Sequence, residues 1–492
     1  MFYSEKIPNT TKSSLRISLS DFSKGLNTLA TENLLPLNYA VNTFNFDFNH
    51  GGLKTGLGIR ELTFYNGEYS KNMIVPSGKK VLKFWHFKRF DKTINDFSPF
   101  LMIYCDDGVI YAGRLATQDT AFYDVGISFD TKPNALNYRI DGVDNFLCLA
   151  PNKMITYNGL GEPKVFTENI PSITSVALHA ERLFATTGGD QSQLWFSDDL
   201  NPTNWNVDQF DGGYIELTDE RGTLKKVIES NNYLYIIREF GISRVSGWGL
   251  QDDFTVKNLY LSTGKIYYNS AVLCGDVLMM MCRDGVYCFN GASMQRLNLG
   301  IDKYIKDVEN NNACGAFLDG KYYLACRLNF DDSREIASET DYSSVNNALI
   351  EYNLTTGAIN IMRGIDICDM APFQTEWFSK LVVCLRNEGA LYEITHLGRS
   401  LGIPTTKVWT SPYTDMGYAL YKKNIKAIYL NTKSNITLII NADGKEYNFE
   451  VKGADNPVRV PINLAAYKFN ITFYCDSDEC EISNPQIEVE LC

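Results

Sequence analysis

The stretch from Gly275 to Gly291 reads GDVLMMMCRDGVYCFNG: an apolar run, a short polar turn with a glycine, and a second apolar run. Apolar and aromatic residues suit the packed surface of a sheet, and glycine supplies the positive φ that many tight turns require. The run Val277–Cys282 has the length of a strand, far below the ~18 apolar residues of a membrane-spanning helix. The stretch therefore predicts two adjacent antiparallel strands joined by a hairpin turn.

Six further stretches share this strand–turn–strand form. Between equivalent glycines, Gly241 to Gly285 spans 44 residues and Gly108 to Gly159 spans 51, close to the period of ~40–50 residues of four-stranded propeller blades. Blades pack face to face, so their strands are buried on both sides, which explains apolar runs that do not alternate. The further stretches are Phe100–Leu115, Asp144–Gly159, Glu181–Asp198, Asn231–Gly247, Asp319–Phe330 (continued by Asn346–Met362) and Lys380–Gly398.

Seven copies between about residues 75 and 400 predict an all-β protein with a seven-bladed β-propeller. Six or eight blades are alternative counts, and a pair of β-sandwiches with similar hairpins is the alternative architecture. Before the copies, Phe44, Phe46 and Phe48 alternate with polar residues, and His50–Gly52 forms a turn. This pattern predicts a hairpin arm that supplies the strand closing the ring.

After the copies, six short strands with polar turns predict a C-terminal β-sandwich. The expected domains are an N-terminal arm with the closing hairpin over residues 1–70, the propeller over 71–400 and the sandwich over 401–492. The start of the chain has no apolar core of signal-peptide length, so we expect a protein made in a cytoplasm, without a membrane anchor. The six sandwich strands are expected at Lys426–Asn431, Ile436–Asn441, Glu446–Val451, Val458–Ile462, Lys468–Cys475 and Gln486–Leu491.

The composition limits the functions that the chain can have. Of 492 residues, 58 are acidic and 46 basic, so the formal net charge is −12, and 45% are hydrophobic. An apolar share of this size builds a core and excludes a disordered chain. The acidic balance excludes affinity for nucleic acid by wholesale neutralisation of phosphates, which needs clustered lysine and arginine.

Metal and thiol chemistry find little support in the sequence. The 12 cysteines lie mostly inside apolar runs, no C-x-x-C occurs, and the four histidines are isolated from one another. Cys475 and Cys480 form the closest pair, and two free thiols beside an acidic turn are favoured over a metal site or a disulfide. We therefore expect no metal site and no cofactor.

Catalytic motifs are also missing. Acidic pairs occur at strand ends, where solvated turns are favoured over calcium or acid–base sites because no D-x-D-x-D-G spacing occurs. Ser197–Trp205, SDDLNPTNW, is similar to the Asp-box of sialidases, but it occurs once, carries an extra residue before Trp205 and has Asn201 in place of glycine. A turn with Trp205 packed between blades is favoured, and we expect no catalytic residue and no enzyme activity. The acidic pairs are Asp106–Asp107, Asp198–Asp199, Asp252–Asp253 and Asp331–Asp332.

The polar insertion Asp331–Asn347 interrupts the sixth copy and is the one excursion from the regular pattern. We interpret it as a surface loop. A contact with a neighbouring subunit or another protein is the alternative, since loops carry recognition on rigid scaffolds.

Three segments resemble tail and head–tail proteins of tailed bacteriophages. The first is SDFSKGLNT from Ser20 with ENLLPLNYAVNTFNFDFNHGGLKTGLGIRE from Glu32, the second is ERLFATTGGDQSQLWFSDDLNPTNWN from Glu181, and the third is VWTSPYTDMGYALYKKNIKAIYL from Val408. The chain departs from the family pattern at Gly56–Gly58, where Arg-x-Gly is common, and this leaves the position in the tail open. The resemblance implies a structural virion protein similar to podovirus tail-hub, packaged-DNA-stabilising and nozzle proteins.

By this resemblance we expect a homo-oligomeric ring, a hexamer, at the head–tail junction of the virion, in contact with portal, adaptor or other tail proteins. The protein would be made in the cytoplasm of the host bacterium. The ring would form part of the channel for phage DNA without sequence-specific binding, and an acidic wall suits this because it repels phosphate. The alternative is a tail propeller that binds or hydrolyses host-surface glycans. A scaffold of the WD-repeat type ranks last, because the Gly-His and Trp-Asp signatures are missing.

Overall fold

The computed structural model describes residues 14–19, 21–22, 24–28, 34–48, 51–65, 67–208, 212–247, 251–330, 345–375 and 377–491. Within these ranges the regular structure consists almost entirely of strands, and the helices with described bounds are α1 (Asp302–Ile305) and the 3-10 helix η2 (Gln251–Asp253). The prediction of an all-β protein is confirmed. No helix in these ranges is long and apolar enough to cross a membrane.

Six antiparallel sheets of four consecutive strands follow one another along the described chain, and a seventh takes one strand from the N-terminal segment. In each sheet the second and third strands are the strand pair of one sequence copy, so all seven copies form hairpins. Their turns use residues that tolerate a positive φ, such as Gly108 (φ 80°) and Asn152 (φ 57°). The six sheets are, in order, β8 (Val81–Asp91), β9 (Asp96–Cys105), β10 (Val109–Arg114) and β11 (Tyr123–Ser128); β12 (Asn134–Ile140), β13 (Val143–Ala150), β14 (Lys153–Tyr157) and β15 (Lys164–Phe166); β16 (Ile173–His179), β17 (Arg182–Thr187), β18 (Gln193–Phe196) and β19 (Gly213–Glu216); β20 (Leu224–Ser230), β21 (Tyr233–Arg238), β22 (Gly241–Ser246) and β23 (Thr255–Leu261); β24 (Ile266–Cys274), β25 (Val277–Cys282), β26 (Gly285–Phe289) and β27 (Met294–Arg296); and β28 (Cys314–Leu318), β29 (Lys321–Cys326), β30 (Ala348–Asn353) and β31 (Ile359–Arg363).

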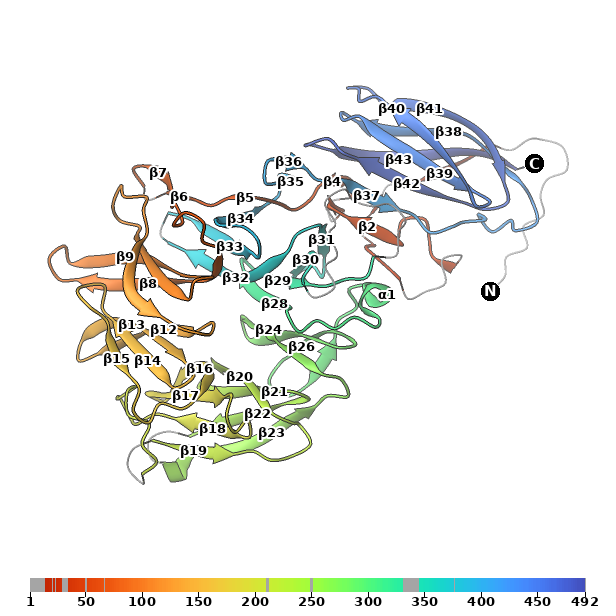
Figure 1. Cartoon of the computed structure of the whole chain (residues 1–492). Helices are drawn as coiled ribbons and strands as arrows, with labels where there is room; N and C mark the ends of the chain where they lie inside the picture. The colour runs from red at the N-terminus through yellow and green to blue at the C-terminus, as the bar shows by residue number, and fades with distance from the viewer. Residues whose placement is uncertain are drawn as a thin grey trace.

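The sheets form a closed ring with the first strand of each nearest the axis (Figure 1). Each first strand contacts the first strand of the next sheet, in the order β8, β12, β16, β20, β24, β28 and β32, and β32 contacts β8. This is the arrangement of a β-propeller. The seventh sheet contains β32 (Ile367–Gln374), β33 (Ser379–Leu385), β34 (Leu391–Thr395) and β5 (Gly58–Glu61), followed by the short strands β35 (Arg399–Ser400) and β36 (Ile403–Pro404).

The N-terminal segment supplies the strand that completes the ring. β5 pairs antiparallel with β34, from Gly58 opposite Thr395 to Glu61 opposite Tyr392. Ile59 on β5 is buried in the apolar cluster between the sixth and seventh sheets. The next two strands, β6 (Thr63–Tyr65) and β7 (Ser70–Asn72), form a separate short hairpin. The closing strand thus comes from before the copies, but it is β5, which follows the hairpin predicted at Phe44–Gly52 and is not part of it.

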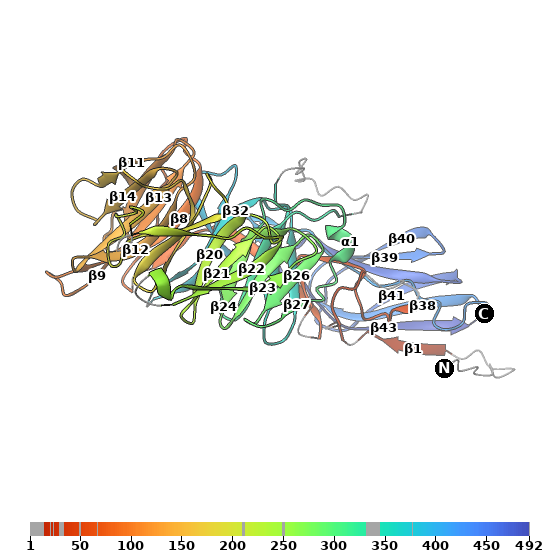
Figure 2. The ribbon, with the colours of Figure 1, turned by 90° about the horizontal axis from the view of Figure 1, so that it is seen from below.

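Two further sheets, called the sandwich below, lie in separate layers beside the ring (Figure 2). Their facing side chains share one apolar cluster, which includes Ile428 and Ile487 from one sheet and Leu438 and Phe473 from the other. A strand is present at each of the six positions predicted after residue 401, and the largest difference is at the last one, which begins at Glu481 and not at Gln486. The first sheet contains β3 (Phe46–Asp47), β4 (Leu53–Thr55), β43 (Glu481–Leu491), β38 (Lys423–Thr432), β41 (Val458–Ala466) and β1 (Ser14–Ser18), and the second contains β2 (Asn42–Phe44), β37 (Lys407–Thr410), β42 (Phe469–Cys475), β39 (Ile436–Ala442) and β40 (Lys445–Val451).

The expected domain boundaries at residues 70 and 401 separate strands that pair with one another in the structure. β1 and β4 both pair with β43, and β2 pairs with β37, so most strands of the expected arm belong to the sandwich. The physical reason is burial: Phe44, Phe46 and Phe48 are at most 3% exposed, and an isolated two-stranded hairpin is too small to cover three aromatic rings.

Asn45 joins the ring and the sandwich. It lies between β2 and β3, where the chain passes from one sheet of the sandwich to the other, and it has a left-handed φ of 61°. Its side-chain Nδ2 donates to the carbonyl of Thr406 (2.7 Å), and its Oδ1 accepts from the backbone N–H of Arg363 on β31 (3.0 Å). The apolar cluster of the sandwich also continues into the fifth and sixth sheets, through residues such as Met281 and Ile350. The two units therefore share one core.

Candidate functional site

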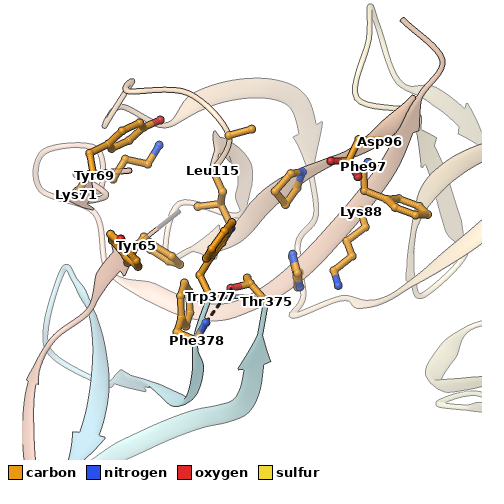
Figure 3. A pocket seen from close by; sticks show the side chains of 14 residues that line it. Tyr65, Tyr69, Lys71, Lys88, Asp96, Phe97, Leu115, Thr375, Trp377 and Phe378 are labelled. Atoms are coloured by element: carbon orange, nitrogen blue, oxygen red, sulfur yellow. Dashed lines mark hydrogen bonds between the residues drawn. The ribbon is translucent and has the colours of Figure 1, made fainter. Parts of the chain in front are cut away.

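A pocket of about 360 Å³ opens between the first and seventh sheets of the ring, and it is called the aromatic pocket below (Figure 3). Its walls come from the hairpin of β6 and β7, from β8 and β9, and from the turn between β32 and β33. These segments are distant in sequence and meet because β5 closes the ring beside the first sheet. The lining residues are Phe64, Tyr65, Tyr69, Lys71, His86, Lys88, Asp96, Phe97, Pro99, Leu115, Ala116, Thr375, Trp377 and Phe378.

Aromatic rings build the floor of this pocket. Phe64 packs edge-on against Phe373 and Phe378 at centroid distances of 5.5 and 5.9 Å, and the latter two rings are stacked on each other at 5.8 Å. Around the rim, Tyr65, Phe97 and Trp377 are 43%, 49% and 51% exposed. A packed floor with exposed aromatic faces offers a rigid stacking surface to a ligand.

The turn before β33 presents Trp377 to the pocket. The backbone N–H groups of Trp377 and Phe378 both donate to Thr375 Oγ1, at 3.2 and 3.3 Å, and this fixes the turn. The indole ring lies against Gly67, where a Cβ atom would approach it to 2.9 Å, and Gly67 has a left-handed φ of 95°. Glycine is thus required here both for the backbone conformation and for the close approach of the indole.

Polar side chains share the lining of the pocket with the aromatic rings. The Lys71 ammonium donates to three backbone carbonyls, those of Arg114, Thr117 and Asp119, at 2.6 to 2.7 Å, which occupies all three of its protons. Lys88 and Asp96 are exposed and supply one charge of each sign. The exposed aromatic faces and these two charges suit the binding of a ligand.

His86 is the titratable residue of the pocket wall. Its ring stacks on Phe373 at 4.3 Å, and burial together with the positive charge of Lys88 lowers its pKa to about 4. Its buried Nε2 has no hydrogen-bond partner within the described residues. At neutral pH the ring is neutral and acts as an aromatic wall.

A second cavity, of about 570 Å³, lies on the sandwich and is called the motif groove below. It runs between β1, the turn at Leu35–Asn38 and the turn at Thr414–Tyr418. Pairing of β2 with β37 brings the two turns together, with Asn42 opposite Thr410. The first and third segments of the phage resemblance, far apart in sequence, therefore line one groove.

Large apolar side chains flank the motif groove. Leu34 directly precedes the first turn and is 80% exposed, and Leu420 follows the second turn and is 88% exposed. Exposed large apolar side chains beside a groove are typical of protein contact sites.

Two of the acidic pairs, Asp106–Asp107 and Asp198–Asp199, lie in turns, as their positions predict. Asp107 accepts hydrogen bonds from Tyr111 and from the backbone of Val109 and pairs with Lys79 at 2.9 Å, and Asp252 and Asp253 form η2. No cluster of three or more potential metal ligands occurs in the described residues. Asp331, Asp332 and the rest of the insertion up to Ser344 lie outside the described residues.

The Asp-box-like turn and the thiol pair both occupy structural positions. Trp205 is 1% exposed, donates from Nε1 to the Pro202 carbonyl (3.0 Å) and packs in the cluster between the second and third sheets. Cys475 and Cys480 are buried free thiols. A hydrogen bond between them lowers the pKa of Cys475 and raises that of Cys480.

No protein-family model matches the chain, and no curated protein matches it. Among solved structures, BBS1N in complex with ARL6DN is similar over 68% of this chain and 97% of that chain, at 10% identity and a TM-score of 0.45. The alignment with the computationally designed Ika8 protein covers 64% of this chain and 99% of that chain, at 10% identity and a TM-score of 0.31. The alignment with KlHsv2, in which loop 6CD is replaced by a Gly-Ser linker, covers 63% of this chain and 92% of that chain, at 10% identity and a TM-score of 0.33. These neighbours are β-propellers. The propeller arrangement of this chain follows from its strand pairing and from the contacts between the first strands of its sheets.

Proposed function

We propose that the chain is a structural protein of a tailed-phage virion, a seven-bladed tail-hub or nozzle-like propeller that assembles as a ring of six copies at the head–tail junction. In that position it forms part of the DNA channel, helps to retain packaged DNA and contacts portal, adaptor or other tail proteins. The observation that carries this proposal is the motif groove, because two segments of the phage resemblance converge there.

The exposed leucines beside the groove support a subunit contact. A contact that buries Leu34 and Leu420 removes two large apolar side chains from water, and each is worth about 1.5–3 kcal/mol when fully buried. A gain of this size is sufficient to favour association strongly, since ~1.4 kcal/mol corresponds to a factor of ten. Two segments that resemble the phage proteins would thus carry assembly contacts at or beside the motif groove.

The charge of the chain is compatible with a DNA conduit. A net charge of −12 repels phosphate, so DNA passes an acidic wall without adhering to it. Retention of packaged DNA then depends on a plug or on the shape of the assembled channel and needs no specific base contacts.

Sedimentation velocity of the purified chain tests the assembly role. We expect closed oligomers for the wild-type chain and a shift to smaller species for the double variant Leu34→Ser, Leu420→Ser. The matched control is Leu160→Ser, since Leu160 is 54% exposed on the ring, in the segment between β14 and β15. A wild-type chain that stays monomeric at every concentration, or a double variant that assembles like Leu160→Ser, contradicts the proposal.

The aromatic pocket favours a second candidate, binding of a host-surface glycan. Sugars present apolar C–H faces and hydroxyl groups, which match the exposed rings of Tyr65 and Trp377 and the charges of Lys88 and Asp96. A glycan array tests this candidate with the wild-type chain, Trp377→Ala and, as control, Tyr421→Ala, which removes a 46% exposed aromatic ring from the sandwich. Binding that only Trp377→Ala abolishes supports the candidate, and an array without binders refutes it.

A further inference from the structure

Four charged side chains gather around the axis of the ring. Lys83 lies on β8, Lys226 on β20 and Asp369 on β32, all of them first strands, and Lys132 lies just before β12. The charges of Lys83 and Asp369 both act on Lys226, and Lys132 interacts with Lys83 and Asp369, so the four groups are close to one another. Three positive charges thus face one negative charge, in a chain whose net charge is −12.

Backbone carbonyls hold two of the ammonium groups in place. Lys226 Nζ donates to the carbonyl of Ala271 on β24 at 2.8 Å, and Lys83 Nζ donates to the carbonyl of Pro133 at 3.3 Å. Lys83 also lies 5.4 Å from the centre of the Trp85 ring. An ammonium carries three protons, so each group keeps donors for a further partner. The carbonyls position the lysines without neutralising them.

The cluster is electrostatically unbalanced. Burial, together with the positive charge of Lys83, lowers the pKa of Lys226 to about 8, although Asp369 opposes this shift. Keeping like charges together in a confined space costs free energy unless a counter-charge is present. One carboxylate leaves an excess of two positive charges, which an anion with two negative charges would balance.

We propose that Lys83, Lys132 and Lys226 bind a small oxyanion of the phosphate or sulfate class on the axis of the ring. Tetrahedral oxyanions accept hydrogen bonds in several directions at once, which fits donors that come from different blades around one axis. Asp369 interacts electrostatically with all three lysines and limits the affinity for an anion by its own negative charge. The site is distinct from the aromatic pocket and the motif groove, and it does not depend on the proposed role in a virion.

Isothermal titration calorimetry with sodium sulfate and with inorganic phosphate tests the site. We expect Lys226→Gln to weaken sulfate binding by about tenfold or more. We expect the matched variant Lys225→Gln to bind as the wild type does, because Lys225 is a neighbour on the same strand that bonds to Gln191 Oε1 (2.8 Å). Asp369→Asn should strengthen binding, a change of opposite sign that a merely structural role of the cluster would not produce.

The pH dependence supplies a second readout. Sulfate keeps its charge while Lys226 loses its proton, so affinity should fall as the pH rises through about 8, and Lys226→Gln should reduce this dependence. Burial also lowers the pKa of Lys83, which accounts for the dependence that remains. Burial raises the pKa of the neighbouring Cys314 far above its ordinary value, so this thiol stays neutral over the range. No sulfate or phosphate binding, equal affinity for Lys226→Gln and the wild type, or weaker binding by Asp369→Asn overturns the proposal. Binding of duplex DNA that Lys226→Gln abolishes overturns it as well, because the axis would then serve nucleic acid.

Discussion

Asn45→Ala tests whether the ring and the sandwich are joined as one folded body. The side chain of Asn45 is 2% exposed and connects the Thr406 carbonyl to the Arg363 backbone N–H, so it joins the segment before β37 of the sandwich to the sixth sheet of the ring. Alanine removes both hydrogen bonds and must also adopt the left-handed φ of 61°.

Three costs add up in this variant. Leaving the Arg363 N–H without the Asn45 acceptor costs about 1–3 kcal/mol, and the loss of the donor to Thr406 costs about 1 kcal/mol. The left-handed backbone costs about 1 kcal/mol more for alanine than for asparagine, whose short polar side chain tolerates this region. We therefore expect Asn45→Ala to lower the free energy of unfolding by about 3–5 kcal/mol.

Equilibrium unfolding in urea measures this change, with two control variants. Asn45→Gly removes the same hydrogen bonds, but glycine adopts the left-handed backbone without strain. Its loss of unfolding free energy should therefore be about 1 kcal/mol smaller than that of Asn45→Ala. Asn95→Ala changes an exposed asparagine with a similar φ of 50° in the turn between β8 and β9, and should cost about 1 kcal/mol. If Asn45→Ala destabilises the protein no more than Asn95→Ala does, the joint at Asn45 does not have the role assigned to it.

Two further changes test the aromatic pocket and the closing strand. The pKa of His86 is about 4 in the folded protein, below its ordinary value. As the pH falls, the unfolded chain therefore binds a proton at this residue before the folded protein does. The free energy of unfolding should fall by about 2–3 kcal/mol between about pH 6.5 and pH 4. His86→Phe should reduce this fall in pH-dependent urea unfolding, and an unchanged profile would contradict the assignment. Ile59→Ala on β5 should cost about 2–5 kcal/mol because Ile59 is 1% exposed, whereas Ile403→Ala, at a residue 70% exposed on β36, should stay within about 0.5 kcal/mol. Limited proteolysis should cut Ile59→Ala faster than Ile403→Ala, and equal rates would argue against ring closure by β5.

The sequence predicts the elements whose pairing partners are near in the chain. Each of the seven copies contains both strands of a hairpin and the turn between them, so turn residues such as Gly108 suffice to locate the pair. The same holds for β39 and β40, which are joined at Asp443–Gly444, where both residues have positive φ.

Pairings between distant segments could not be predicted in this way. β2 is three residues long and pairs with β37, more than 350 residues later, and β1 pairs with the last strand, β43. A strand that short carries no signal for its partner, because register depends on the faces that burial selects in the folded protein. Most strands of the expected N-terminal arm are therefore part of the sandwich.

The aromatic pocket was missed for a related reason. Tyr65, Phe97 and Trp377 come from three separate segments, and each alone is an ordinary exposed aromatic residue at a strand end or turn. One local feature pointed to the pocket: the hydrogen bond from the Phe378 N–H to Thr375 Oγ1 closes a turn, and this turn leaves the large side chain of Trp377 exposed to solvent. Only the closure of the ring shows that three such residues surround one cavity.

Two-dimensional class averages of the purified chain, recorded by electron microscopy, test whether it assembles as a ring. We expect closed rings of six copies, in which each copy shows a seven-bladed disc with the sandwich attached beside it. Single discs at every protein concentration, or trimers without a closed ring, would contradict an assembly role at the head–tail junction.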